Sequence, residues 1–140
     1  MQISLALTLV LAFLTLSVWH VYWAAGGRIG KPAAVGDGKT VFVPGAFATM
    51  FVAVGLGACA ALVAATAGLI PSPLSTHALG SLSFALASAL LVRAIGDFRF
   101  VGFFKRAADS AFARRDTLLY SPICLLLALA VGTLAVLSRP

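Results

Sequence analysis

The sequence predicts an all-α integral membrane protein, a four-helix bundle with both termini on the outer side of the membrane. Three observations predict this fold class: the composition, four apolar runs of spanning length, and the position of the basic residues. Of the 140 residues, 61% are hydrophobic and only 10% are charged, and the mean hydropathy is +1.07. A soluble domain carries about 25% charged residues, so the composition excludes one. The length allows a single transmembrane domain over residues 1–140.

Four apolar runs define the predicted spans. At a rise of ~1.5 Å per residue, about 20 helical residues cross the ~30 Å hydrocarbon core of a bilayer. The predicted spans are 3–23, 46–69, 76–95 and 118–137, and the predicted cytoplasmic loops are 24–45 and 96–117. No Lys or Arg precedes the first run, and it ends in aromatic residues rather than in a small-residue cleavage site. We therefore expect a mature helix there and not a signal peptide.

The basic residues predict the orientation, because cytoplasmic loops carry an excess of Lys and Arg. Nine of the ten lie in or next to the two long loops: Arg28, Lys31, Lys39, Arg93, Arg99, Lys105, Arg106, Arg114 and Arg115. Only Arg139 lies on the opposite side. We therefore expect the long loops in the cytoplasm and both termini outside. Orientation also explains the net charge of +6 better than nucleic-acid binding does, so no nucleic-acid partner is expected.

Small residues recur at every fourth position in the two middle spans, where they let helix backbones approach closely. They are Ala53, Gly57, Ala61 and Ala65 in the second span, and Ser81, Ala85 and Ala89 in the third. This spacing predicts that the second and third spans pack as an antiparallel hairpin through these two faces.

The two cysteines indicate helix packing rather than chemistry. Cys59 and Cys124 each lie inside an apolar run, with no second Cys or His at metal-ligand or redox-pair spacing. We expect no metal site and no cofactor.

The hinge segment, residues 93–106, interrupts the apolar sequence with alternating charges and four phenylalanines. Arg93 lies about one turn inside the end of the third span, and Asp97 follows four residues later, on the same face of a helix. Two interpretations stay open: Arg93 pairs with Asp97 or reaches the head groups, or Arg93, Asp97 and Arg99 converge on a ligand. Lys105 is expected in solvent or among head groups. At the fourth span, Asp116 or Ser121 is the expected cap, and Pro122 either starts the regular helix or kinks its first turns.

Three separated motifs combine aromatic residues with polar or charged ones. They are His20-x-Tyr22-Trp23-Ala24-x-Gly26-Gly27, Arg93-x-x-Gly96-Asp97-Phe98-Arg99-x-x-Gly102-Phe103, and Phe112-Ala113-x-x-Asp116-x-x-x-Tyr120-Ser121-Pro122. They resemble a family of small four-helix bacterial membrane proteins catalogued as domain of unknown function 3995. The resemblance implies a multi-pass protein of the bacterial cytoplasmic membrane. It implies no reaction and transfers no catalytic residue.

The candidate site gathers the polar residues expected near the cytoplasmic leaflet: His20, Tyr22, Arg93, Asp97, Arg99, Asp116 and Tyr120. Tyr22, with Trp19 and Trp23, also fits an aromatic belt at the membrane interface. His20 either has a hydrogen-bonded or proton-handling role or is a satisfied interfacial histidine, and both interpretations stay open. Cations beside aromatics favour a site that binds or modifies an amphiphile with an anionic head, a lipid or isoprenoid phosphate.

Whether the protein is an enzyme stays open, and membrane lipids are the expected partners. The alternative is a non-catalytic small transporter, or an accessory or structural subunit in a homo-oligomer or with a partner membrane protein. No acidic residue lies deep in a span, which lowers the transporter interpretation.

Overall fold

The computed structural model describes residues 2–30, 45–96, 98, 101–106 and 111–138. Within these ranges the ordered elements are all helical: α1 Gln2–Ala24, α3 Ala46–Thr66, α4 Thr76–Ile95, α5 Ala111–Arg115, the π-helical turn η1 Asp116–Tyr120, and α6 Ser121–Leu137. Four helices are long and apolar enough to cross a membrane: Gln2–Ala24, Ala46–Thr66, Thr76–Ile95 and Phe112–Leu137. The predicted all-α, four-helix membrane fold is confirmed.

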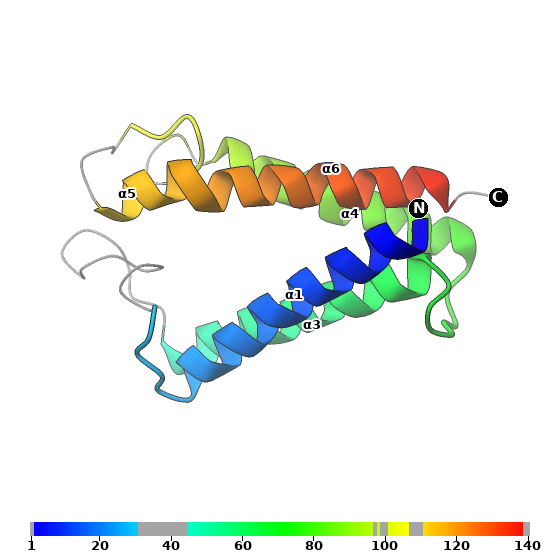
Figure 1. Ribbon diagram of the computed structural model, residues 1–140, viewed down its shortest axis with the longest axis horizontal. Helices are drawn as coiled ribbons and strands as arrows, with labels where there is room; N and C mark the ends of the chain where they lie inside the picture. The colour runs from blue at the N-terminus through cyan, green and yellow to red at the C-terminus, as the bar shows by residue number, and fades with distance from the viewer. Residues whose placement is uncertain (1, 31–44, 97, 99–100, 107–110, 139–140) are drawn as a thin grey trace.

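The helices are arranged as two pairs. Helix α1 packs along α3, and α4 packs along α6. Figure 1 shows the two pairs meeting near the chain termini and separating toward the opposite end. We call the first end the terminal end. The second, which carries residues 24–30, the hinge segment and α5, is the hinge end.

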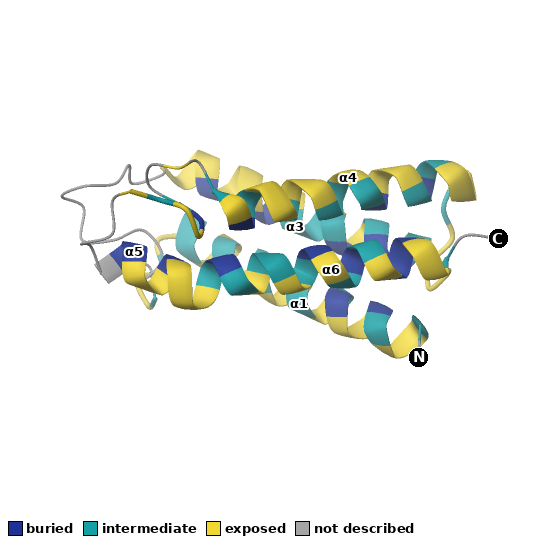
Figure 2. Ribbon diagram, turned by 90° about the horizontal axis from the view of Figure 1, so that it is seen from above, coloured by how far each residue is buried: buried dark blue, intermediate teal, exposed yellow. Residues whose placement is uncertain are grey.

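The apolar core lies in the half of the molecule near the termini. Its buried side chains come from α1, α3 and α6: Ala6, Leu9, Phe13, Ala60, Val63, Val131 and Leu134. Polar contacts tie the helices together around it. Gln2 Nε2 donates to Ser138 Oγ at 2.8 Å, joining the first helix to the last, and the hydroxyls of Thr66 and Ser83 lie 2.9 Å apart between α3 and α4. Most outward faces of the helices are exposed, as the lipid-facing surface of a membrane protein is (Figure 2).

The expected hairpin contact between the two small-residue faces is wrong. The face of α3 that carries Ala53 and Gly57 packs against α1, where Ser17 Oγ donates to the carbonyl of Ala53 at 2.7 Å and is the nearest side-chain neighbour of Gly57. On α4, the expected partners Ser81, Ala85 and Ala89 are exposed. A small-residue face allows close approach but does not specify which helix approaches, because all four helices offer similarly apolar surfaces.

The ends of the middle helices follow local sequence signals. Helix α3 stops at Thr66, three residues before the predicted Leu69, in a Schellman motif: Gly68 has φ +72°, its amide donates to Ala65, and the Leu69 amide donates to Ala64. Helix α4 begins after Ser75, whose Oγ accepts from the amide of Ala78 at 3.2 Å.

The fourth helical rod is longer than predicted. Helix α5, η1 and α6 follow one another without a break (Figure 1), so helical structure begins at Ala111 rather than near residue 118. Asp116 and Ser121 therefore lie inside the rod and do not cap it. Pro122 lies in the first turn of α6, where its missing amide hydrogen is tolerated.

Candidate functional site

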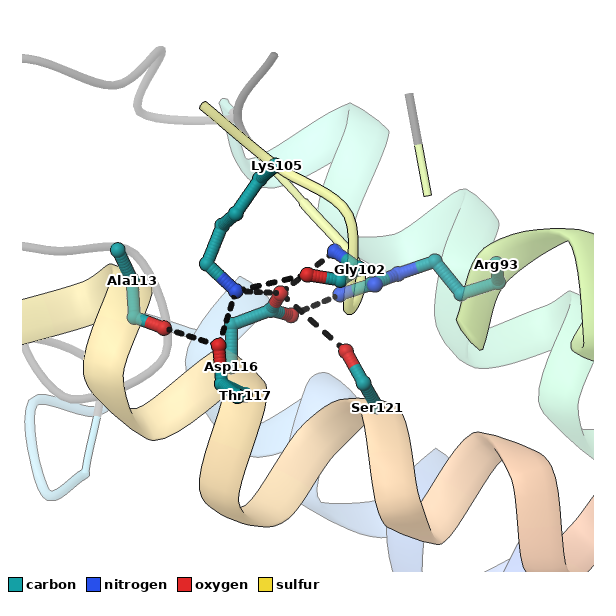
Figure 3. Close-up of polar contacts among 7 residues, drawn as sticks. All are labelled: Arg93, Gly102, Lys105, Ala113, Asp116, Thr117 and Ser121. Carbon is teal, nitrogen blue, oxygen red and sulfur yellow. Dashed lines mark hydrogen bonds and ion pairs between the residues drawn. The ribbon is translucent and has the colours of Figure 1, made fainter. Parts of the chain in front are cut away.

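Asp116 is the centre of the polar structure at the hinge end. It is 0% exposed. Its Oδ1 accepts from Arg93 Nη2 at 2.7 Å, and its Oδ2 accepts from the amide of Gly102 at 2.7 Å, Lys105 Nζ at 3.1 Å and Ser121 Oγ at 3.3 Å. Figure 3 shows these donors converging on the carboxylate from α4, the hinge segment and α6. We call these five residues the Asp116 cluster. A buried carboxylate is tolerated only with such partners.

The π-helical turn brings Asp116 and Ser121 together. The Ser121 amide donates to the Asp116 carbonyl five residues back, instead of to a carbonyl four residues back. Pro122 has no amide hydrogen, and its ring would collide with the carbonyl four residues before it in a regular α-helix. The wider turn relieves this conflict and places the Ser121 hydroxyl against the Asp116 carboxylate.

Two glycines shape the hinge segment. Gly96 has φ +99° and ends α4, and Gly102 has φ +90°. A Cβ added to Gly102 would lie 2.3 Å from both the Gly96 Cα and the Ile95 carbonyl oxygen, so the two backbones touch. Beyond this contact, the Phe103 amide donates to the Ala94 carbonyl at 2.9 Å. The returning chain thus caps α4 and aims the Gly102 amide at Asp116.

Lys105 is buried, which contradicts the expectation that it lies in solvent or among head groups. Its side chain is 3% exposed. The ammonium group donates to the Gly102 carbonyl at 2.8 Å, to Asp116 Oδ2 and to Thr117 Oγ1. All three of its N–H donors are therefore used inside the protein.

Arg93 pairs with Asp116, which lies 23 residues away on the fourth rod. The Arg93 side chain is 36% exposed. Its second terminal nitrogen, Nη1, is buried and makes no hydrogen bond to any residue that the structure describes. Asp97 and Arg99, the two other charged candidates here, lie outside the described residues.

A family model described as "Protein of unknown function (DUF3995)" matches residues 13–131 of the chain. The chain belongs to this family. The match covers all three motifs, including every residue of the Asp116 cluster. No curated protein and no solved structure matches this chain.

The first motif of the DUF3995 chain folds on the other helix pair. His20 Nδ1 donates to the Leu16 carbonyl at 2.7 Å, since a carbonyl can only accept. The Tyr22 ring fills the space beside Gly27, where a Cβ would lie 2.4 Å from it, and Trp23 Nε1 donates to the Ile29 carbonyl at 2.8 Å. These contacts stay within α1 and the residues that follow it. They close the end of the helix and do not reach the Asp116 cluster.

Of the seven candidate residues, Arg93 and Asp116 are in direct contact. Tyr120 is one turn from Asp116 in the same rod, and its ring lies 6.4 Å from that of Phe112. Sequence reasoning missed Gly102, Lys105 and Ser121 as members of the site. Gly102 and Ser121 were present in the motifs, so their spacing was an available signal. Lys105 had none, because a lysine after two phenylalanines is typical of a membrane interface.

The opposite end of the DUF3995 chain holds a small cavity of about 140 Å³. Its polar lining consists of the hydroxyl residues Thr66, Thr76 and Ser138, and none of its lining residues is charged. Among the described residues, no three metal-binding side chains lie together. The ion pairs of the described residues lie instead in the Asp116 cluster, at the hinge end.

Proposed function

We propose that this DUF3995 protein binds an amphiphile with an anionic head group, a lipid or isoprenoid phosphate, beside Arg93. The unpaired Nη1 of Arg93 supports the proposal most directly. A buried donor without an acceptor costs about 1–3 kcal/mol. An anionic oxygen would supply the acceptor, and charge-assisted bonds from arginine to phosphate are among the stronger hydrogen bonds in proteins. The head group would displace the protein atoms that now cover Nη1.

The surroundings of Arg93 also suit an amphiphile. Arg93 is in the last turn of a helix long enough to span the membrane, at the depth where a side chain can reach head groups. Phe98, Phe103 and Phe104 of the hinge segment are exposed at the same end. Aromatic side chains of this kind favour the membrane interface. Under the proposal this end faces the inner leaflet of the cytoplasmic membrane, which is the orientation that the excess of Lys and Arg predicts.

The arrangement favours binding over a reaction. Asp116 is the acidic side chain of the cluster, and four donors engage its two oxygens. A carboxylate held in this way is a poor general base, because each donor stabilises its charged form. Its evident task is to hold Arg93 and the hinge segment in place.

The test is lipid retention by the purified protein, measured by native mass spectrometry. The protein is placed in phosphatidylcholine nanodiscs that contain a small fraction of phosphatidylglycerol, and Arg93→Gln is compared with wild type. Retention of phosphatidylglycerol should fall about threefold or more, as expected for one charge-assisted contact. Arg106→Gln is the matched control, since it removes one exposed cation of the same segment.

Arg93→Lys separates a loss of binding from a loss of folding. It keeps the positive charge that pairs with Asp116 but lacks the second terminal nitrogen of arginine. It should fold and still retain less lipid than wild type. Farnesyl phosphate and farnesol, added to the protein in detergent, distinguish an isoprenoid phosphate from a glycerolipid. The proposal is wrong if wild type shows no preference for anionic over neutral amphiphiles, or if Arg106→Gln lowers retention as much as Arg93→Gln.

A further inference from the structure

We infer that the site beside Arg93 selects an amphiphile with a single negative charge, a phosphodiester, over a phosphomonoester that carries two. This inference rests on the proposed function and adds the class of head group. Two independent observations support it: the net charge of the Asp116 cluster and the buried side-chain nitrogen that the cluster leaves without an acceptor among the described residues.

The charge of the cluster is one positive. Arg93 and Lys105 each contribute one positive charge, and Asp116 contributes one negative. A charge without an opposite partner is costly in a site with little water. The ligand that best balances the single positive charge of the cluster therefore carries one negative charge.

The free donors point to the same partner. The three N–H groups of Lys105 are bound to Gly102, Asp116 and Thr117. The Gly102 amide and the Ser121 hydroxyl are bound to Asp116. Arg93 Nη1 is the cluster's buried side-chain donor without an acceptor among the described residues. The two hydrogens of this nitrogen can serve the two non-bridging oxygens of a phosphodiester, but the cluster offers no further buried side-chain donor of this kind to the second charge of a monoester.

A wild-type experiment tests the inference without any substitution. Phosphatidylglycerol, a diester, and phosphatidic acid, a monoester, are mixed in equal small amounts into phosphatidylcholine nanodiscs, with matched acyl chains. The diester keeps one charge throughout, whereas the monoester gains its second charge above a pKa of about 6. The retained ratio of diester to monoester should be near one at low pH. At about pH 8 the ratio should rise to about threefold or more, because the second negative charge of phosphatidic acid then has no positively charged partner in the site.

The ratio of the two lipids reports the titration of the lipid alone. A change of charge on the protein affects the binding of both lipids, because both lie beside the same protein groups. Those groups are Arg93 on α4, Lys105 on the hinge segment, and Arg115, Asp116, Tyr120 and Cys124 on the fourth rod. A ratio at or below one at pH 8 would overturn the inference while leaving the proposed function intact. Retention of neither lipid above phosphatidylcholine would instead contradict the proposed function itself.

Asp116→Asn provides the second arm. The substitution keeps the shape of the side chain and raises the cluster charge to two positive. Preference at pH 8 should therefore move toward phosphatidic acid, by about threefold or more relative to wild type. Ala25→Lys is the matched control: it adds one positive charge at the same end of the molecule, at an exposed residue that follows α1, and should leave the ratio unchanged. An unchanged ratio in a folded Asp116→Asn protein overturns the inference, and if that variant does not fold the wild-type pH series decides it.

Discussion

Asp116 has no exposed surface, yet it lies in the first turns of a helix that is apolar enough to span a membrane. An isolated carboxylate there would be among the costliest groups to bury. Arg93, Lys105 and the Gly102 amide make it tolerable by neutralising the charge and filling its lone pairs. The cluster therefore acts as one unit, because removing any member leaves the remaining buried polar groups without a partner.

The stability of single-residue variants tests this coupling. Arg93→Ala should destabilise the protein by on the order of 1–3 kcal/mol, toward the lower end because its side chain is 36% exposed and partly screened. Lys105→Ala should destabilise it by a similar amount, since the ammonium group is buried. Both are measured as thermal unfolding in detergent.

Arg106→Ala is the control for these variants. Arg106 is exposed, and its loss should change the unfolding temperature little. If Lys105→Ala behaved like Arg106→Ala, the burial of Lys105 against Asp116 would contribute nothing to the fold.

At the scale of secondary-structure elements, the hinge segment decides where the charges meet. Gly96 ends α4 in a backbone conformation that only glycine adopts easily, and Gly102 touches it. The chain can then return over the end of α4 and present its amide and Lys105 to the fourth rod. On that rod, the π-helical turn before Pro122 turns Ser121 toward the same carboxylate.

Gly102→Ala tests the role of the glycine contact. The new methyl group would collide with the backbone of Ile95 and Gly96, at a position whose φ of +90° already strains an alanine. We expect a loss of about 1–3 kcal/mol and a weaker hold on Asp116, measured by thermal unfolding in detergent.

Gly55→Ala is the matched control, because Gly55 is exposed within α3 and an added Cβ meets nothing within 4 Å. It should be neutral or should stabilise the protein by up to about 1 kcal/mol, since alanine is the better helix former. Equal stability of the two variants would show that the Gly96–Gly102 contact is dispensable.

At the scale of the whole molecule, the two helix pairs separate the termini from the charged cluster. The terminal end holds the apolar core and the small uncharged cavity, and the hinge end holds the ion pairs. The charge count predicts that the hinge end faces the cytoplasm and that both termini face outward.

Cysteine labelling in intact cells tests this orientation. In a variant without the native Cys59 and Cys124, His77→Cys should react with a membrane-impermeant thiol reagent, because His77 is exposed at the terminal end. Arg106→Cys, at the hinge end, should react only after the cells are permeabilised. The reverse pattern would contradict the predicted topology and would move the proposed binding site to the outer leaflet.

The sequence alone determined the class and the helices of this protein. In lipid, every backbone group must be satisfied within its own helix, so apolar length translates directly into spanning helices. The motifs marked Arg93, Asp116, Gly102 and Ser121 as unusual, but they did not show that these residues meet.

Which helices pair, and which charges pair, depends on how the whole chain folds. The lipid-facing and helix-facing sides of these spans are equally apolar, so periodicity could not identify α1 as the partner of α3. The pairing of Arg93 with Asp116 spans 23 residues, and it depends on the path of the chain through the hinge segment. The same path brings Lys105 within reach of the buried Asp116 carboxylate, and the lysine is therefore buried. Without such a partner, a lysine next to a membrane extends into solvent.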